Sequence, residues 1–165
     1  MKVAVLTVSD RSARGERQDL SGPAVVDRVR RKGWDLVRTG IVSDDQGAIE
    51  GELRKWTEAG IELILTTGGT GFAPRDRAPE ATLAVCERLA PGIPEAMRRA
   101  GKAKTPHAIL SRAVAGIRRG TLIVNLPGSP KAVREHLEVI LPVLPHAVEL
   151  LREAATGEAG HRSAH

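Results

Sequence analysis

The chain has 165 residues, of which 41% are hydrophobic and 2% aromatic, and its formal net charge is +5. The length suits a single domain with an aliphatic core, and the scarcity of aromatic residues argues against the stacking platforms that bind single-stranded nucleic acid. The positive charge would fit a nucleic-acid-binding module, but basic residues alternate with acidic ones along the chain. We therefore expect solvated helix faces, no specific nucleic acid partner, and a surface that favours small phosphorylated substrates.

Cysteine content and hydropathy indicate the compartment. Cys86 is the only cysteine, which excludes an intrachain disulfide and suits a reducing environment. We expect it to be a buried thiol on a helix rather than a nucleophile. The apolar run at residues 3–8 is too short for a signal peptide or a membrane span. These features predict a cytoplasmic protein without membrane association.

The first half of the chain alternates strands with helices. Apolar runs at residues 3–8, 34–42 and 62–66 predict parallel strands buried in a sheet. Between them, Ser21 is the expected N-cap of a helix that runs to about residue 31, and Asp45 is the expected N-cap of a helix over 46–59. This order predicts a layered fold with right-handed crossovers.

The second half predicts further helices and a hairpin. Helices are expected from Pro79 to residue 89 and from Pro94 to about residue 100. Apolar runs at 113–117 and 121–126 predict a hairpin that adds one antiparallel strand to the sheet.

The last helix is expected to begin near Ser129, to break around Pro142 and Pro145, and to resume until residue 155. We therefore predict a three-layer α/β fold, with a mostly parallel sheet and helices on both faces. It forms a single domain over residues 1–155, followed by a flexible C-terminal tail over 156–165.

Polar or glycine-rich segments follow each main strand. In open α/β sheets, ligands bind at the carboxyl ends of the strands. The four segments at these predicted ends are Ser9-Asp10-Arg11, residues 43–45, residues 66–71 and residues 125–130. Their common position predicts a binding site at one edge of the sheet.

The glycine-rich segment at residues 66–71 is the strongest of these signals. Gly68, Gly69 and Gly71 allow the backbone N–H groups to turn inward and to form a nest for phosphate oxygens. It is not a Walker loop, which would end in Gly-Lys-Ser/Thr, because Phe72 follows Gly71. The pattern also departs from the dinucleotide-binding fingerprint. A tight turn without a ligand remains the alternative interpretation.

Two aspartates accompany the predicted phosphate loop. Asp44 follows the second strand and Asp76 follows the glycine segment. Carboxylates beside bound phosphates would repel them unless a cation lay between, so the pair indicates Mg²⁺ and metal-assisted phosphoryl or nucleotidyl transfer. Each alone could equally be a salt-bridged surface residue. Ser129 and Lys131 could bind an anion at a helix N-terminus, or Ser129 could simply cap that helix.

The motifs taken together resemble the MogA/MoaB family of molybdenum cofactor biosynthesis. They are TVSDRS at 7–12, DLSG at 19–22, LTTGGTG at 65–71, PRDRAPEAT at 74–82, SR at 111–112 and NLPGSPKA at 125–132. The resemblance covers residues 3 to about 151. It implies binding of molybdopterin and Mg-ATP, transfer of AMP to the terminal phosphate of the pterin, release of pyrophosphate, and a homotrimer. Residues 94–101 and 130–151 are the candidate trimer contacts, and a molybdenum-insertion protein is a candidate partner.

The resemblance also assigns roles to residues. It implies that Asp44 and Asp76 are the catalytic, metal-binding residues. The expected substrate- and nucleotide-binding residues are Ser9, Asp10, Arg11, Thr67, Gly68, Gly69, Thr70, Gly71, Arg75, Ser111, Arg112, Pro127, Gly128 and Ser129. Arg11, Arg75 and Arg112 are alternative candidates for holding pyrophosphate or the pterin phosphate. A MoaB-type protein that binds the pterin without adenylyl transfer is the alternative function.

Overall fold

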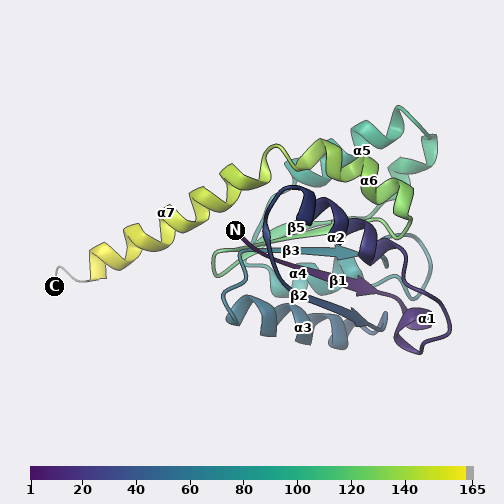
Figure 1. Ribbon diagram of the computed structural model, residues 1–165, viewed down its shortest axis with the longest axis horizontal. Coiled ribbons are helices and arrows are strands. Elements are labelled where there is room, and N and C mark those ends of the chain that lie inside the picture. The colour runs from purple at the N-terminus through teal and green to yellow at the C-terminus, as the bar shows by residue number, and fades with distance from the viewer. Residues whose placement is uncertain (163–165) are drawn as a thin grey trace.

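A computed structural model describes the backbone of residues 1–162 and the side chains of residues 1–157. Its strands are β1 (Lys2–Val8), β2 (Asp35–Val42), β3 (Leu63–Thr67), β4 (Arg88–Leu89), β5 (Ala115–Arg118) and β6 (Thr121–Leu126). They form a six-stranded sheet in the order β2-β1-β3-β6-β5-β4 (Figure 1). The pairs among β2, β1, β3 and β6 are parallel, and β5 is antiparallel to both of its neighbours. The predicted mostly parallel sheet with one antiparallel strand is confirmed.

Helices cover both faces of the sheet (Figure 1). One face carries α2 (Ser21–Arg31), α5 (Gly92–Lys102) and α6 (Pro130–Ile140), and the other carries α3 (Gln46–Glu58) and α4 (Ala78–Val85). Successive side chains of a strand point to opposite faces. Val3 and Val5 of β1 therefore join the core beneath α2 and α6, whereas Ala4 and Leu6 join the core over α3. This arrangement confirms the three layers.

Helix α4 is shorter than expected, and β4 was not predicted. The helix ends at Val85, and the following backbone pairs with β5 through Glu87 N–H to the Ile117 carbonyl (2.8 Å) and Ala90 N–H to the Ala115 carbonyl (2.8 Å). The unpaired edge of β5 therefore outweighs the local helical preference. Cys86 is half-buried just beyond the helix, and burial raises the pKa of its thiol to about 11. The thiol is consequently a poor nucleophile at neutral pH, as expected.

The two predicted N-caps have different outcomes. Asp45 caps α3, because its carboxylate accepts the Ala48 N–H at 2.9 Å. Ser21 is instead the first residue of α2, and the carboxylate of Asp19 accepts the Gly22 N–H at 2.9 Å. Asp19 thus satisfies one of the first-turn N–H groups that have no partner within the helix.

The C-terminal helices are separate, as predicted from the prolines. Helix α7 (Leu144–Arg162) begins with Pro145 in its first turn, where no backbone N–H is needed. It extends away from the body of the molecule (Figure 1). Residues 156–162, expected to be a tail, continue this helix, and residues 163–165 lie outside the described residues. Within residues 1–162, no helix combines the length and apolar character needed to cross a membrane.

Candidate active site

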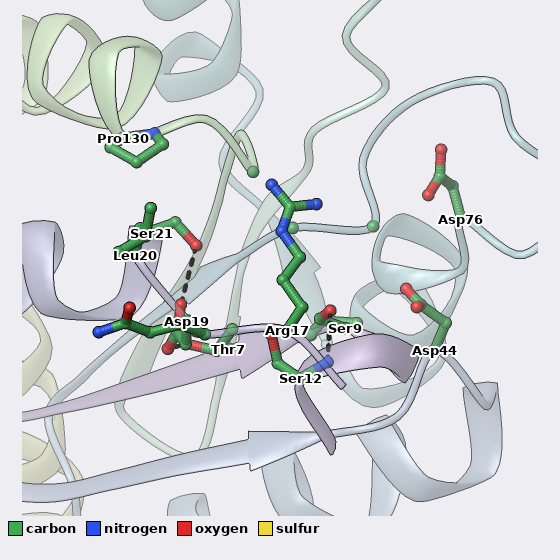
Figure 2. Close-up of a pocket in the computed structure, with 15 residues that line it drawn as sticks. Thr7, Ser9, Ser12, Arg17, Asp19, Leu20, Ser21, Asp44, Asp76 and Pro130 are labelled. Carbon is green, nitrogen blue, oxygen red and sulfur yellow. Dashed lines mark hydrogen bonds between the residues drawn. The ribbon is translucent and has the colours of Figure 1, made fainter. Parts of the chain in front are cut away.

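A polar cavity of about 230 Å³ lies at the carboxyl ends of β1, β3 and β6 (Figure 2). Six residues singled out in the sequence line it, namely Ser9, Asp44, Gly68, Gly69, Asp76 and Gly128. The other lining residues were not predicted individually, although Pro130 belongs to the predicted segment 125–130: Thr7, Val8, Ser12, Arg17, Gln18, Asp19, Leu20, Ser21 and Pro130. Most of these come from the segment around α1 (Asp10–Ala13) and the loop that follows it.

The glycine loop requires glycine for steric reasons. Gly68 and Gly69 have φ values of 96° and 65°, in the left-handed region. A Cβ atom on Gly68 would lie 2.3 Å from the Val8 carbonyl oxygen, so the loop crosses closely over the end of β1. Thr67 Oγ1 donates to the Pro127 carbonyl at 2.6 Å, and this bond joins the loop to the segment after β6. The loop therefore packs against the end of β1, is bonded to the segment after β6, and lines the cavity with Gly68 and Gly69.

Asp44 is held beside this loop by Asp10. The Asp10 N–H donates to Asp44 Oδ2 at 2.8 Å, and the Asp44 N–H donates to Asp10 Oδ1 at 3.0 Å. Burial raises the pKa of Asp44, and the negative charges of Asp10 and Asp76 raise it further. The hydrogen bond from the Asp10 N–H lowers this pKa, but the net direction is upward. The Asp44 carboxylate thus lies in a locally negative environment, which a bound cation would stabilise.

Asp76 lies on the same side of the cavity as Asp44 (Figure 2). Its Oδ2 accepts the Ala73 N–H at 3.0 Å. Asp44 Oδ1 and Asp76 Oδ1 make no hydrogen bond within the described residues, so each carboxylate retains an oxygen for a ligand. Carboxylate oxygens are the ligands that Mg²⁺ prefers. No group of three or more metal-ligating side chains occurs in the described part of the chain.

Two of the three candidate phosphate-binding arginines bind protein groups instead. Arg75 donates to both carboxylate oxygens of Asp10, at 2.8 and 3.0 Å, and thereby lowers the pKa of Asp10. Arg112 donates to the Gly71 carbonyl (2.8 Å) and the Asp76 carbonyl (2.7 Å) and pairs with Glu80. Arg112 therefore anchors the loop that carries Asp76. The third candidate, Arg11, is exposed on α1 and does not line the cavity.

A second cavity, of about 290 Å³, adjoins the same loop. The predicted residues Thr70, Gly71, Ser111 and Pro127 line it, together with His107 and His136 among others. Because Gly68 and Gly69 line the first cavity and the next two loop residues line the second, the glycine loop lies between the two.

Six predicted residues line neither cavity: Asp10, Arg11, Thr67, Arg75, Arg112 and Ser129. Ser129 acts as the N-cap of α6, because its hydroxyl oxygen accepts the Ala132 N–H at 3.1 Å.

Asp19 is the most informative residue that sequence reasoning missed. Its carboxylate accepts the Thr7 hydroxyl at 2.6 Å and the Gly22 N–H at 2.9 Å, and so fastens the loop after α1 to β1 and α2. A Cβ on Gly22 would lie 2.3 Å from Asp19 Oδ2, which explains a glycine in the first turn of a helix. The DLSG motif was the available signal, but its role depends on the contact with Thr7.

Comparison with known proteins shows the family to which this chain belongs. Residues 4–146 match the model of a probable molybdopterin binding domain. The molybdopterin adenylyltransferase of Helicobacter pylori J99 is 43% identical over 152 residues, which cover 90% of this chain and 86% of that protein. Gephyrin of Dictyostelium discoideum is also 43% identical over 90% of this chain, but the match spans only 22% of gephyrin. The crystal structure of the molybdopterin biosynthesis enzyme MoaB of Thermus thermophilus superposes with a TM-score of 0.86 at 51% identity, covering 91% of this chain and 95% of that one.

Proposed function

Because this chain belongs to the MogA/MoaB family of molybdopterin-binding domains, we propose that it is a molybdopterin adenylyltransferase of molybdenum cofactor biosynthesis. It transfers AMP from ATP to the terminal phosphate of molybdopterin and releases pyrophosphate. The observation that carries the proposal is the pair of carboxylates, Asp44 and Asp76, which share one cavity with the glycine loop. Two carboxylates beside a glycine loop suit a cation that lies between them and bound phosphates, as adenylyl transfer requires.

The chemistry is an in-line displacement at the α-phosphorus of ATP. A phosphate oxygen of molybdopterin forms the new bond to phosphorus, and the bond from that phosphorus to the bridging oxygen of pyrophosphate breaks. Both reactants are anionic, so bringing them together is the main electrostatic obstacle. Little proton transfer is required, which agrees with a cavity lined by no histidine among the described residues.

Asp44 and Asp76 would hold Mg²⁺ through their unbonded carboxylate oxygens. The bound ion would neutralise phosphate charge in the ground and transition states. Asp10 orients Asp44, and Arg112 fixes the loop of Asp76, so that the two carboxylates are preorganised. The glycine loop brings its backbone close to the phosphates.

The second cavity extends this site beyond the aspartates. Its lining combines apolar groups, such as Ala108 and Leu110, with the hydroxyl of Ser111 and the ring of His107. Such a lining suits a heteroaromatic ring better than a phosphate chain. We assign it to a ring of one of the two substrates, next to the phosphates in the polar cavity.

A second candidate function is supported by the identity of 51% to the Thermus MoaB structure. In that case the protein would bind the pterin without transferring AMP. The decisive experiment is incubation of the purified protein with molybdopterin and Mg-ATP, followed by mass spectrometry of the pterin. Adenylyl transfer predicts a product that is heavier by one AMP unit, with release of pyrophosphate. Bound but unmodified molybdopterin would favour the second function.

The proposal also includes an assembly and a cellular context, which the family resemblance implies. We propose a cytoplasmic homotrimer that passes its product to a molybdenum-insertion partner protein. The partner is supported by gephyrin, in which the matching segment is 22% of a longer chain.

A further inference from the structure

The polar cavity contains an arginine whose charge is not used by the protein. Arg17 lines the cavity, and its guanidinium reaches into the space between Ser21 and Pro130 on one side and Asp44 and Asp76 on the other (Figure 2). It forms neither an ion pair nor a hydrogen bond with any residue of the described part of the chain. An arginine that enters a cavity without a partner is available for an anionic ligand.

Arg14, Arg75 and Arg112 differ from Arg17 in this respect, because each already binds a protein group. Arg75 binds both oxygens of Asp10, and Arg112 binds two carbonyls and Glu80. Arg14, in the same loop as Arg17, pairs with Glu16 at 2.9 Å and is absent from the cavity lining. Recruiting Arg75 or Arg112 for a ligand would break two or more existing bonds, whereas recruiting Arg17 breaks none.

The backbone around Arg17 is positioned for this role. Two residues later, Asp19 is fastened to Thr7 at 2.6 Å and to the start of α2 through Gly22. The loop therefore cannot move away from the end of β1 without breaking these bonds. Its placement brings Arg17 to the polar cavity, although the side chain itself is exposed and free to reorient.

We propose that Arg17 binds a phosphoryl group in this cavity, opposite the aspartate pair. The guanidinium would donate two parallel hydrogen bonds to phosphate oxygens, a geometry that arginine matches well. The inference rests on the proposed adenylyl transfer for the origin of the ligand. The phosphoryl group comes either from the pyrophosphate end of ATP or from the phosphate of molybdopterin, and these share the same recognition chemistry.

The test compares Arg17→Gln with Arg14→Gln. Both variants remove one positive charge from the same loop, but only the first removes a group from the cavity. Calorimetric titration of inorganic pyrophosphate in the presence of Mg²⁺ forms one arm, and titration of molybdopterin forms the other. A charge-assisted contact of this kind is worth roughly ten- to hundredfold in affinity. We expect Arg17→Gln to lose that factor for at least one probe and Arg14→Gln to bind both as the wild type does.

The outcomes distinguish ATP from molybdopterin as the source of the phosphoryl group, and they distinguish failure of the Arg17 subsite from failure of the proposed adenylyl transfer. Weaker pyrophosphate binding alone assigns Arg17 to the departing end of ATP, and weaker molybdopterin binding alone assigns it to the pterin phosphate. Arg17→Lys should restore part of the lost affinity, which a purely structural role would not predict. Wild-type affinity of Arg17→Gln for both probes would overturn the inference, even if AMP transfer is observed. Arg17-dependent pyrophosphate binding without AMP transfer would instead overturn the proposed function and leave the anion subsite standing.

Discussion

Asp10 and Asp44 exchange reciprocal hydrogen bonds, in which the carboxylate of each accepts the backbone N–H of the other, at 2.8 and 3.0 Å. The two residues follow β1 and β2, so the exchange joins the ends of neighbouring strands at the cavity. Because Arg75 occupies both Asp10 oxygens as well, Asp10 is better described as a support for Asp44 than as a ligand-binding residue. We therefore expect Asp44 and Asp76, rather than Asp10, to contact the reacting phosphates or their metal ion.

Asp76→Asn should reduce turnover by orders of magnitude while the fold is retained. The amide keeps an oxygen that can accept the Ala73 N–H, but it removes the negative charge that would bind Mg²⁺. Stability should change by no more than about 0.5 kcal/mol, as is usual for surface loops. Steady-state kinetics and thermal unfolding test both statements. Asp35→Asn, at an exposed aspartate of β2, is the matched control and should retain wild-type turnover.

Gly69→Ala should weaken ATP binding more than its effect on stability explains. A Cβ there would lie 3.2 Å from Asp44 Oδ1 and 3.3 Å from the Ala78 Cβ, so it would crowd the carboxylate that we propose binds Mg²⁺. The left-handed φ of 65° adds a conformational cost of about 1 kcal/mol.

Gly60→Ala is the matched control for this variant. Gly60 has a similar φ of 77°, but a Cβ there would meet no atom within 4 Å. Both variants should lose stability in urea unfolding through the left-handed φ, Gly69→Ala more because of its close contacts, and only Gly69→Ala should lose affinity for Mg-ATP. Equal affinities would mean that the loop is merely a turn.

The ion pair between Glu62 and Arg152 predicts a pH dependence of stability. Arg152 holds the pKa of Glu62 at about 2, well below the usual 4.5, and thereby joins the start of β3 to α7. A carboxyl whose pKa is depressed by folding contributes stability above its unfolded pKa and loses it as the pH falls through the folded pKa. Wild-type stability should therefore fall between about pH 4.5 and pH 2.

Glu62→Gln isolates that contribution. We expect the variant to be less stable than the wild type at pH 7 by about 1 kcal/mol, after allowance for solvent screening of the partly exposed pair. The two proteins should converge in stability near pH 2. Urea unfolding at both pH values measures the difference, and an undiminished difference at low pH would exclude the ion pair as its cause.

Light scattering should give a mass of three chains of 17.6 kDa. Helix α7 leaves the body of the molecule, and the groove at its base includes Ile93, Ile117 and Leu151. In a closed ring of three chains, a neighbouring chain would cover this apolar groove, and burying it would stabilise the trimer. Of the contact segments expected from the sequence, this groove includes Ala147, Leu150 and Leu151 of 130–151 but no residue of 94–101. A concentration-independent mass of one chain would exclude the trimer without affecting the cavity.

The sequence predicted most of the fold because β1, β3 and β6 are nearly continuous apolar runs. The expectation that β2 is buried was wrong, because β2 is the edge strand and its side chains are mostly exposed or half-buried. It missed β4 because Arg88 and Leu89 carry no strand pattern, and their extended form depends on pairing with β5. The aspartates of the site could be predicted because strand-end loops converge in such a sheet. The role of Arg17 could not be predicted, because the sequence does not show which arginines are already paired. Arg75 and Arg112 are paired with residues 65 and 32 positions away, and Arg17 is left for a ligand.

The most direct test of the account follows the α-phosphorus of ATP. The protein is incubated with molybdopterin, Mg²⁺ and ATP labelled at that phosphorus, and the label in the pterin is compared with the pyrophosphate released. Adenylyl transfer through the aspartate site predicts one labelled phosphorus in the pterin per pyrophosphate, and orders of magnitude less product from Asp44→Asn and Asp76→Asn. Label that stays in free AMP or ATP, or full product from both variants, would contradict it.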